Sequence, residues 1–205
     1  MSGRTLGVVD IMVDPRQIAN ARSLLAAVPR GVRIAQMRAV NKVGAGARKR
    51  IVTKLWREMA VSQRSIRKHN VWLERGTYSD PWAVLSIVGR RIPLKEFQAR
   101  KTRKGVTYRI RRTGKRKLVK HAFLQTTKKG KYGVFVRAGR GKDRQPKRPL
   151  IPLFGPSAPE VVADVKALSE RILSREIGAK LQAEFSRQIN VLLGQMAGTV
   201  AGSAK

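Results

Sequence analysis

The residues whose types and spacing could do chemistry are lysines and arginines gathered in the middle of the chain. Residues 90–148 hold 23 Lys and Arg against 2 Asp and Glu, in a chain of 205 residues with a net charge of +33. Each such cation near a phosphate releases a condensed counterion, which gives affinity that falls with salt and ignores base sequence. The candidate contacts to nucleic acid or to an acidic partner lie in basic loops and at their strand ends. They are Arg103, Lys104, Arg109, Arg111, Arg112, Lys115, Arg116, Lys117, Lys128, Lys129, Lys131, Arg140, Lys142, Arg144, Lys147 and Arg148.

The charge falls away on both sides of this middle part. Residues 1–89 carry a net +11 and residues 149–205 a net +1. Self-repulsion of this size disfavours a compact state unless a polyanion or counterions supply the opposite charge. Nucleic acid is the favoured partner, an acidic protein surface is the second candidate, and a plain basic surface is the alternative to both. We expect the basic loops to present their charge on one rim of a sheet.

No set of side chains suggests catalysis. Without Cys the chain has no disulfide, no thiolate zinc site and no cysteine nucleophile. His69 and His121 have no second His nearby, and the Gly-rich residues 139–142 lack the spacing of a phosphate-binding P-loop. Asp10 and Asp14 are four residues apart, but no base or nucleophile accompanies them. We therefore expect a protein that is not an enzyme and that has no cofactor and no metal.

Composition places the chain among globular proteins. Its hydrophobic content of 42% is ordinary for a folded domain, and one domain is the expectation at this length. The first residues lack a long apolar stretch, and no run approaches the 18 or so apolar residues of a membrane span. We expect a soluble protein made in a reducing compartment.

A long helix is predicted over residues 32–60. Its apolar face has members three or four residues apart. They are Met37, Val40, Gly44, Ala47, Ile51, Leu55 and Met59. Gly44 and Gly46 each cost about 1 kcal/mol relative to Ala in a helix interior, so they mark either a close crossing or a kink.

Shorter elements surround this helix. A strand is predicted over residues 6–13, and Pro15 opens a helix at its first turn. Ser62 is the predicted N-cap of a basic helix that ends near Asn70. After Pro81 the pattern changes to the period of two that is typical of strands. The predicted strands cover residues 82–88, 106–110, 118–124 and 132–137, and basic loops follow at 100–105, 114–117, 127–131 and 138–148.

The last third is predicted to be helical. Residues 149–156 indicate an extended linker, with a hinge at Phe154-Gly155-Pro156-Ser157. Ser157 and Glu160 then form a capping box for a long helix with an apolar stripe. The prediction is one α+β domain over 1–205, in which N-terminal helices and a long C-terminal helix pack on a small, mostly antiparallel sheet. Its parts are a helical part at 1–75, a basic β-meander at 80–152, a helix at 157–195 kinked near 174–178, and a flexible tail at 197–205.

Five segments, taken in order, resemble the minor tail protein Z family of tailed phages and prophages. The resemblance covers residues 15–195, and the order of the segments carries it. They are Gln36-Met37-Arg38-Ala39-Val40-Asn41-Lys42-Val43, the basic helix at 61–68, the paired strands at 121–124 and 131–137, the segment Arg148-Pro149-Leu150-Ile151-Pro152-Leu153-Phe154-Gly155-Pro156-Ser157, and the helix at 173–182.

The resemblance implies a structural protein of the phage neck or tail end. Such a protein helps to complete the tail and to join it to the head, in the virion and before that in the host cytoplasm. Its implied partners are copies of itself in a sixfold ring, the tail terminator, the tail tube, the connector and the phage DNA backbone, with no membrane. The alternative is a sequence-nonspecific nucleic-acid-binding protein of the ribosome-associated or nucleoid type.

Overall fold

The computed structural model describes residues 5–26, 28, 30–127, 130–138, 149–162 and 176–202. Their contacts form two compact units, each assembled from separate stretches of chain. The helix-rich unit contains residues 5–51, 71–87 and the described part of 166–205. The strand-rich unit contains residues 52–70 and the described part of 88–165. The predicted α+β class is confirmed, and a single domain over the whole chain stays a prediction.

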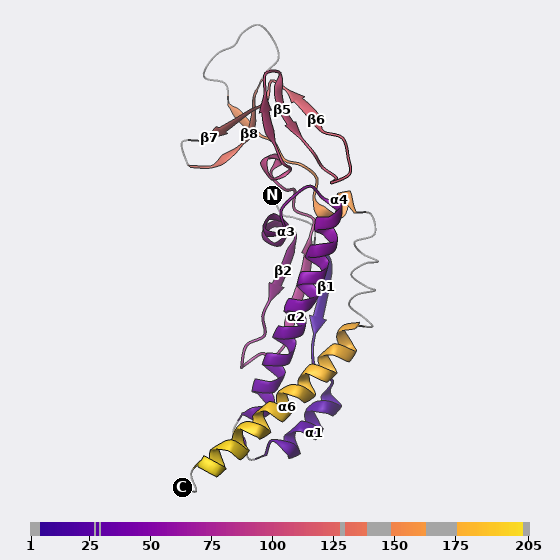
Figure 1. Ribbon diagram of the computed structural model, residues 1–205, viewed down its shortest axis with the longest axis vertical. Helices are drawn as coiled ribbons and strands as arrows, with labels where there is room; N and C mark the ends of the chain where they lie inside the picture. The colour runs from indigo at the N-terminus through magenta and orange to yellow at the C-terminus, as the bar shows by residue number, and fades with distance from the viewer. Residues whose placement is uncertain are drawn as a thin grey trace. The chain divides into compact units, whose positions relative to one another are not determined.

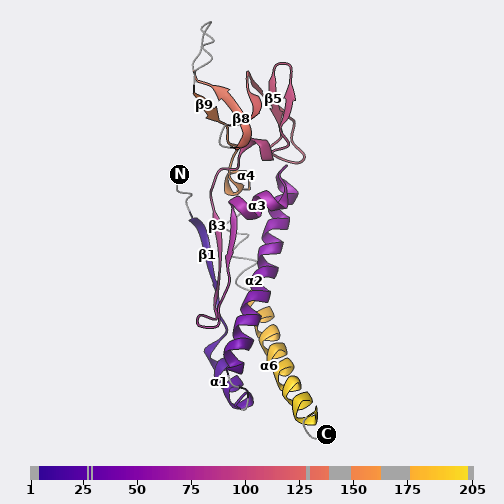
Figure 2. The same ribbon diagram turned by 90° about the vertical axis from the view of Figure 1, so that its left-hand side faces the viewer.

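The helix-rich unit places α2 between a small sheet and α6 (Figure 2). The sheet has the strand order β1-β3-β2, and β2 pairs antiparallel with β3 so that Val71 faces Ile87. The elements are β1 (Thr5–Ile11), α1 (Pro15–Leu24), α2 (Gly31–Glu58), β2 (Val71–Glu74), β3 (Ala83–Val88) and α6 (Glu176–Gly202). The first 21 residues of α2 belong to this unit and the rest to the strand-rich unit.

The predicted apolar face of α2 is confirmed. From Val40 to Met59 every predicted member of that face is buried, and Met37 is half-buried. A Cβ atom at Gly44 would lie 3.1 Å from Cδ1 of Leu73 and 3.4 Å from Cδ1 of Ile11, so the helix and the sheet approach closely there. A Cβ atom at Gly46 would meet nothing within 4 Å. Only the first of the two glycines therefore serves a close crossing.

One polar clamp fixes the β2–β3 hairpin to α2. The side-chain amide of Asn41 donates to the carbonyl oxygen of Gly76 at 2.9 Å, and its Oδ1 accepts from the N–H of Gly76 at 2.9 Å. Both backbone groups of Gly76 are thereby satisfied by one half-buried side chain, as buried backbone groups require. A Cβ atom at Gly76 would lie 2.7 Å from the carbonyl oxygen of Trp82, so only glycine fits.

The strand-rich unit holds two antiparallel sheets, β4-β5-β6 and β7-β8-β9 (Figure 1). Phe97, Ile92 and Val106 are fully buried between its elements. The elements are α3 (Gln63–His69), the 3-10 helix η1 (Leu94–Glu96), β4 (Arg100–Thr102), β5 (Gly105–Tyr108), β6 (Lys117–Lys120), β7 (Phe123–Thr126), β8 (Tyr132–Arg137), β9 (Leu150–Pro152) and α4 (Ala158–Val161). The predicted N-cap of α3 is confirmed, since Oγ of Ser62 accepts from the N–H of Ser65 at 3.1 Å.

Two predictions for this unit are wrong. The strand expected over 118–124 is two strands, because His121 adopts a φ of 61° and turns the chain between β6 and β7. The segment expected to be an extended linker with a hinge is part of a sheet. Its β9 pairs with β8, and Phe154 bridges to Pro93. The N–H of Gly155 also donates to the carbonyl of Ile92 at 2.8 Å, so this segment is fixed at several points.

The C-terminal helix is interrupted where the sequence predicts continuity. Ser157 N-caps a short helix and donates its N–H to Glu160 at 3.3 Å, as in a capping box. Val162 then leaves helical geometry with φ −114° and ψ 96°. Residues 163–175, with the first two residues of the predicted kink at 174–178, lie outside the described residues. The helix α6 contains Gly178 and extends through Gly202, further than the predicted end at 195.

Candidate nucleic-acid interface

The strand-rich unit contains a long stretch of sequence without any carboxylate side chain. Residues 97–142 hold 17 Lys and Arg and no Asp or Glu. This stretch forms β4, β5, β6, β7 and β8. A surface of one sign that lacks internal ion pairs attracts a polyanion over a distance of about a Debye length, roughly 10 Å at 0.1 M salt.

The antiparallel pairing puts cations at both ends of the β4-β5-β6 sheet. Arg103 and Lys104 lie in the turn between β4 and β5, at one end. Residues 109–116 connect β5 to β6 and lie at the other end. The prediction of a single charged rim is therefore wrong for this sheet, because each hairpin reverses the chain direction.

Five of the sixteen predicted contact residues have exposed side chains without a hydrogen bond or ion pair to any described residue. They are Arg103, Lys104, Lys115, Lys117 and Lys131. Lysine and arginine side chains of this kind keep their full charge and their donors for a partner. Seven more predicted residues lie outside the described part of the chain. They are Lys128, Lys129, Arg140, Lys142, Arg144, Lys147 and Arg148.

The remaining four predicted residues hold the unit together. Arg111 donates from Nη2 to the carbonyl oxygen of Val161 at 2.9 Å. Arg112 donates from Nε to the carbonyl oxygen of Trp56 at 2.8 Å, and Arg109 donates to the carbonyl of Arg112 at 3.3 Å. These guanidinium groups link residues that are about 3, 50 and 56 positions apart in sequence. Their first role is structural.

Arg116 donates hydrogen bonds to two residues of its own sheet region. Its Nη2 donates to the carbonyl oxygens of Gln98 at 2.7 Å and Thr107 at 3.0 Å. Desolvation, followed by the charges of Arg100 and Arg109, lowers the pKa of Arg116 from its ordinary value. The side chain stays cationic, since guanidinium groups are not deprotonated in proteins. Arg116 is bonded to the backbone of its own unit, whereas its neighbours Lys115 and Lys117 have exposed side chains.

The structure adds two cations that sequence reasoning missed. Lys101 and Lys120 line a hollow of about 530 Å³ together with Arg103, Lys104 and His121. The register brings them there, since Gly105 faces Lys120 and Val106 faces Lys101. In the sequence, Lys101 and Lys120 are visible only as basic residues near Gly105 and His121. The pairing of β4 and β6 with β5 brings the two lysines together. No carboxylate lines this hollow among the residues that the structure describes.

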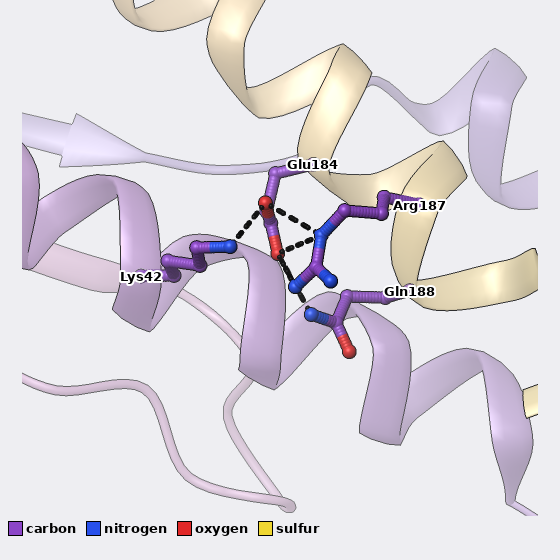
Figure 3. Close-up of polar contacts among 4 residues, drawn as sticks. All are labelled: Lys42, Glu184, Arg187 and Gln188. Carbon is purple, nitrogen blue, oxygen red and sulfur yellow. Dashed lines mark hydrogen bonds and ion pairs between the residues drawn. The ribbon is translucent and has the colours of Figure 1, made fainter. Parts of the chain in front are cut away.

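A different arrangement neutralises charge in the helix-rich unit (Figure 3). The carboxylate of Glu184 lies 2.9 Å from Nζ of Lys42, 2.6 Å from Nη2 of Arg187 and 2.7 Å from Nε2 of Gln188. The bond to Arg187, opposed by desolvation, and the bonds to Lys42 and Gln188 hold the pKa of Glu184 at about 2. Lys42 on α2 is thereby tied to α6. The group acts as an ion-pair clamp between two helices.

Other kinds of site are not found in the part of the chain that is described. Within it, no three His, Cys, Asp or Glu side chains lie together in a way that could hold a metal ion. Of its helices, none combines the length and the apolar character needed to cross a membrane.

The comparison with protein families finds a match over most of the chain. The family described as prophage minor tail protein Z (GPZ) matches residues 18–195. The chain belongs to this family. It is therefore a structural protein of a phage tail and a component of the virion. No curated protein matches the chain, and no solved structure matches it.

Proposed function

We propose that this tail protein completes the end of the tail that joins the head. Its copies form a sixfold ring there, in contact with the tail terminator, the tail tube and the connector. In this arrangement the exposed cations of the strand-rich unit lie along the path of the DNA and contact its phosphate backbone without reading sequence. The alternative partner for the same cations is an acidic protein surface.

The observation that supports the proposal is the carboxylate-free stretch at 97–142. A chain of net charge +33 that assembles in many copies accumulates strong self-repulsion. DNA at the neck of a filled head supplies the opposite charge in the same place. Four of the described exposed cations, Arg103, Lys104, Lys115 and Lys117, stand at the two ends of the β4-β5-β6 sheet, so more than one phosphate can be reached by one subunit.

The rival proposal of a ribosome-associated or nucleoid protein rests on the same charge alone. Membership in a phage tail protein family supports a role in the tail and does not support a ribosome-associated or nucleoid role. A recognition helix, or a row of exposed aromatic rings on the β4-β5-β6 sheet, would have favoured sequence reading or single-strand stacking. Along β4, β5 and β6 the cations stand instead among aliphatic and threonine side chains and one half-buried aromatic residue, Tyr108.

Tail joining in vitro tests this function. Tails assembled without the protein are mixed with DNA-filled heads, and either the wild-type chain or a variant with Arg103→Gln, Lys104→Gln, Lys115→Gln and Lys117→Gln is added. We expect the wild-type chain to restore joined, infectious particles. We expect the variant to be incorporated but to yield about tenfold fewer infectious particles, since each lost phosphate contact weakens DNA binding.

Two outcomes would contradict the proposal at different points. If the wild-type chain leaves joining unchanged, the role at the head-proximal end is wrong. If the variant restores infectivity fully, the DNA contact is wrong and the tail role stands. Lys49→Gln with Lys54→Gln is the matched control, because both lysines are exposed on α2 outside the carboxylate-free stretch.

A further inference from the structure

A second hollow in the strand-rich unit differs from the basic surface described above. It has a volume of about 930 Å³ and lies where the β7-β8-β9 sheet meets η1 and the end of α3. Its apolar lining includes Tyr132, Val134, Leu153 and Phe154. Tyr132 is 49% exposed and Phe154 is 46% exposed, so two aromatic side chains open toward solvent at one place.

The backbone around Phe154 is fixed although its ring is exposed. The N–H of Leu153 donates to the carbonyl of Val134 at 2.9 Å, and the N–H of Gly155 donates to the carbonyl of Ile92 at 2.8 Å. A Cβ atom at Gly155 would clash with the ring of Phe97, so the chain next to Phe154 lies directly against the core. An aromatic residue held rigidly at a surface loses little entropy when a partner covers it, which is typical of binding anchors.

The charged side chains around this hollow have one sign. Lys68, Lys95 and Lys131 line it, and no Asp or Glu does so among the described residues. His69 also lines it. Burial and then the charge of Lys68 lower the pKa of His69, with smaller effects from Glu96, which raises it, and from Arg90 and Lys95, which lower it. Burial therefore favours the neutral imidazole, which has one hydrogen-bond donor and one acceptor.

The geometry favours a side chain of a protein over a base of nucleic acid. Nζ of Lys95 lies 5.6 Å from the centroid of the Tyr132 ring, so one face of that ring is already covered by a cation. Much of the remaining floor is aliphatic, from Pro93, Val134, Pro152 and Leu153. Strand addition at Phe154 is also blocked, because residues 92–94 already pair with this segment. A partner must bind here through its side chains.

We propose that this hollow docks a segment of another tail protein in which an apolar side chain is flanked by Asp or Glu. The apolar side chain packs on Phe154 and Tyr132, and the flanking carboxylates pair with Lys95, Lys131 and Lys68. Charge complementarity of this kind speeds association and selects against basic partners. The proposal does not depend on DNA contact by the β4-β5-β6 sheet, since no residue lines both hollows.

Peptide binding to the full chain tests this docking site. The probe is a fluorescein-labelled peptide with the sequence Asp-Glu-Phe-Leu-Asp-Glu, followed by fluorescence anisotropy. We expect saturable binding, and we expect about tenfold weaker binding for Phe154→Ser and for Lys95→Glu with Lys131→Glu, as for loss of one anchor or of paired charges. Leu118→Ser and Lys54→Glu with Arg57→Glu are matched controls, since these residues are exposed in the same unit but lie outside the hollow.

Several results would overturn the proposal. They are an absence of binding, equal binding by an Asp-Glu-Ala-Ala-Asp-Glu peptide, and equal losses in the control variants. Single-stranded oligothymidine is also tested as a competitor of the labelled peptide. If it displaces the peptide, and if Phe154→Ser weakens its own binding, the hollow binds nucleic acid instead. Phe154→Ser should keep the far-ultraviolet circular dichroism spectrum and the duplex DNA affinity of the wild-type chain. This result would show that the variant is folded, so that its loss of peptide binding is due to the docking site.

A crosslink in the assembled particle gives the second readout. Phe154 is replaced by the photo-crosslinking residue p-benzoylphenylalanine, and particles that have incorporated the chain are irradiated. We expect an adduct with a tail protein, and peptide mapping should place it in a segment that carries Asp or Glu beside an apolar residue. An adduct with DNA, or with a basic segment, would contradict the proposal.

Discussion

The guanidinium carbon of Arg112 lies 4.1 Å from the centroid of the Trp56 ring, and its Nε donates to the carbonyl of the same residue at 2.8 Å. A cation from the most basic part of the chain is thus used to close its own fold. The same holds for Arg111 and Arg116, whose guanidinium groups reach backbone carbonyls. The basic surface therefore consists of two kinds of residue, one that builds the unit and one that is left for a partner.

Substitution of Arg112 distinguishes the cations that stabilise the fold from those that are exposed to a partner. We expect Arg112→Ala to lower the free energy of unfolding by about 1–3 kcal/mol, because it removes a stacking cation and leaves a half-buried carbonyl without its donor. Lys117→Ala removes an exposed cation of the same sheet region and should change stability by less than about 0.5 kcal/mol. Urea unfolding followed by tryptophan fluorescence measures both. Equal stability of the two variants would show that the contact to Trp56 is not structural.

The three consecutive cations 115–117 provide a sharper contrast. We expect Lys115→Gln with Lys117→Gln to leave stability unchanged and to reduce the salt slope of duplex DNA binding by about 2, at roughly 0.9 per phosphate contact. Arg116→Gln should instead lower stability by about 1–2 kcal/mol, because it loses donors to the carbonyls of Gln98 and Thr107. Anisotropy titrations at several salt concentrations and urea unfolding measure the two effects. An unchanged slope in the double lysine variant would remove these residues from the interface.

The ion-pair clamp at Glu184 makes stability depend on pH. The folded-state pKa of about 2 is below the ordinary value of 4.5, so the stabilisation is present above pH 4.5 and is lost as the pH falls toward 2. We expect Glu184→Gln to lower the free energy of unfolding at pH 7 by about 1–3 kcal/mol and to flatten the decline between those two pH values.

Thermal unfolding across that pH range measures the effect of Glu184. Glu74→Gln is the control, because that side chain is exposed on β2. A parallel decline of the wild-type chain and Glu184→Gln between pH 4.5 and 2 would mean that the clamp does not contribute.

The two glycines of α2 should respond to substitution in opposite directions. Gly46→Ala adds a methyl group into open space and should stabilise the helix by up to about 1 kcal/mol. Gly44→Val places branched carbons against Leu73 and Ile11 and should destabilise it by about 1–3 kcal/mol. Thermal unfolding compares them. Destabilisation by both would mean that α2 needs flexibility at this point.

Much of the fold was predictable because its signals are local. The spacing of apolar residues from Val40 to Met59 and the N-cap at Ser62 determine α2 and α3 within a few residues of chain. The turn at His121 was missed because a positive φ at a non-glycine residue has no sequence signature of its own. The strand β9 was missed because Pro149 and Pro152 favour an extended linker as much as an edge strand.

The sequence predicts which stretch of the chain is basic, but it does not predict which of its cations are structural and which are exposed to a partner. Charge counting along the chain finds the basic stretch, because counting needs no contacts. The partners of Arg111 and Arg112 are 50 and 56 residues away, so no local pattern separates them from Lys115 or Lys117. The hollow at Phe154 likewise depends on pairing between Pro93 and Phe154, which are far apart in sequence.

The central claim is that the exposed cations of the strand-rich unit lie beside DNA at the head-proximal end of the tail. Imaging of the intact neck by electron cryo-microscopy, at a resolution that traces β4, β5 and β6, tests it most directly. We predict copies of this chain arranged around the tail axis, with Arg103, Lys104, Lys115 or Lys117 within contact distance of DNA density. Copies located at the distal tip of the tail, or copies whose β4-β5-β6 cations all face the exterior, would contradict the account.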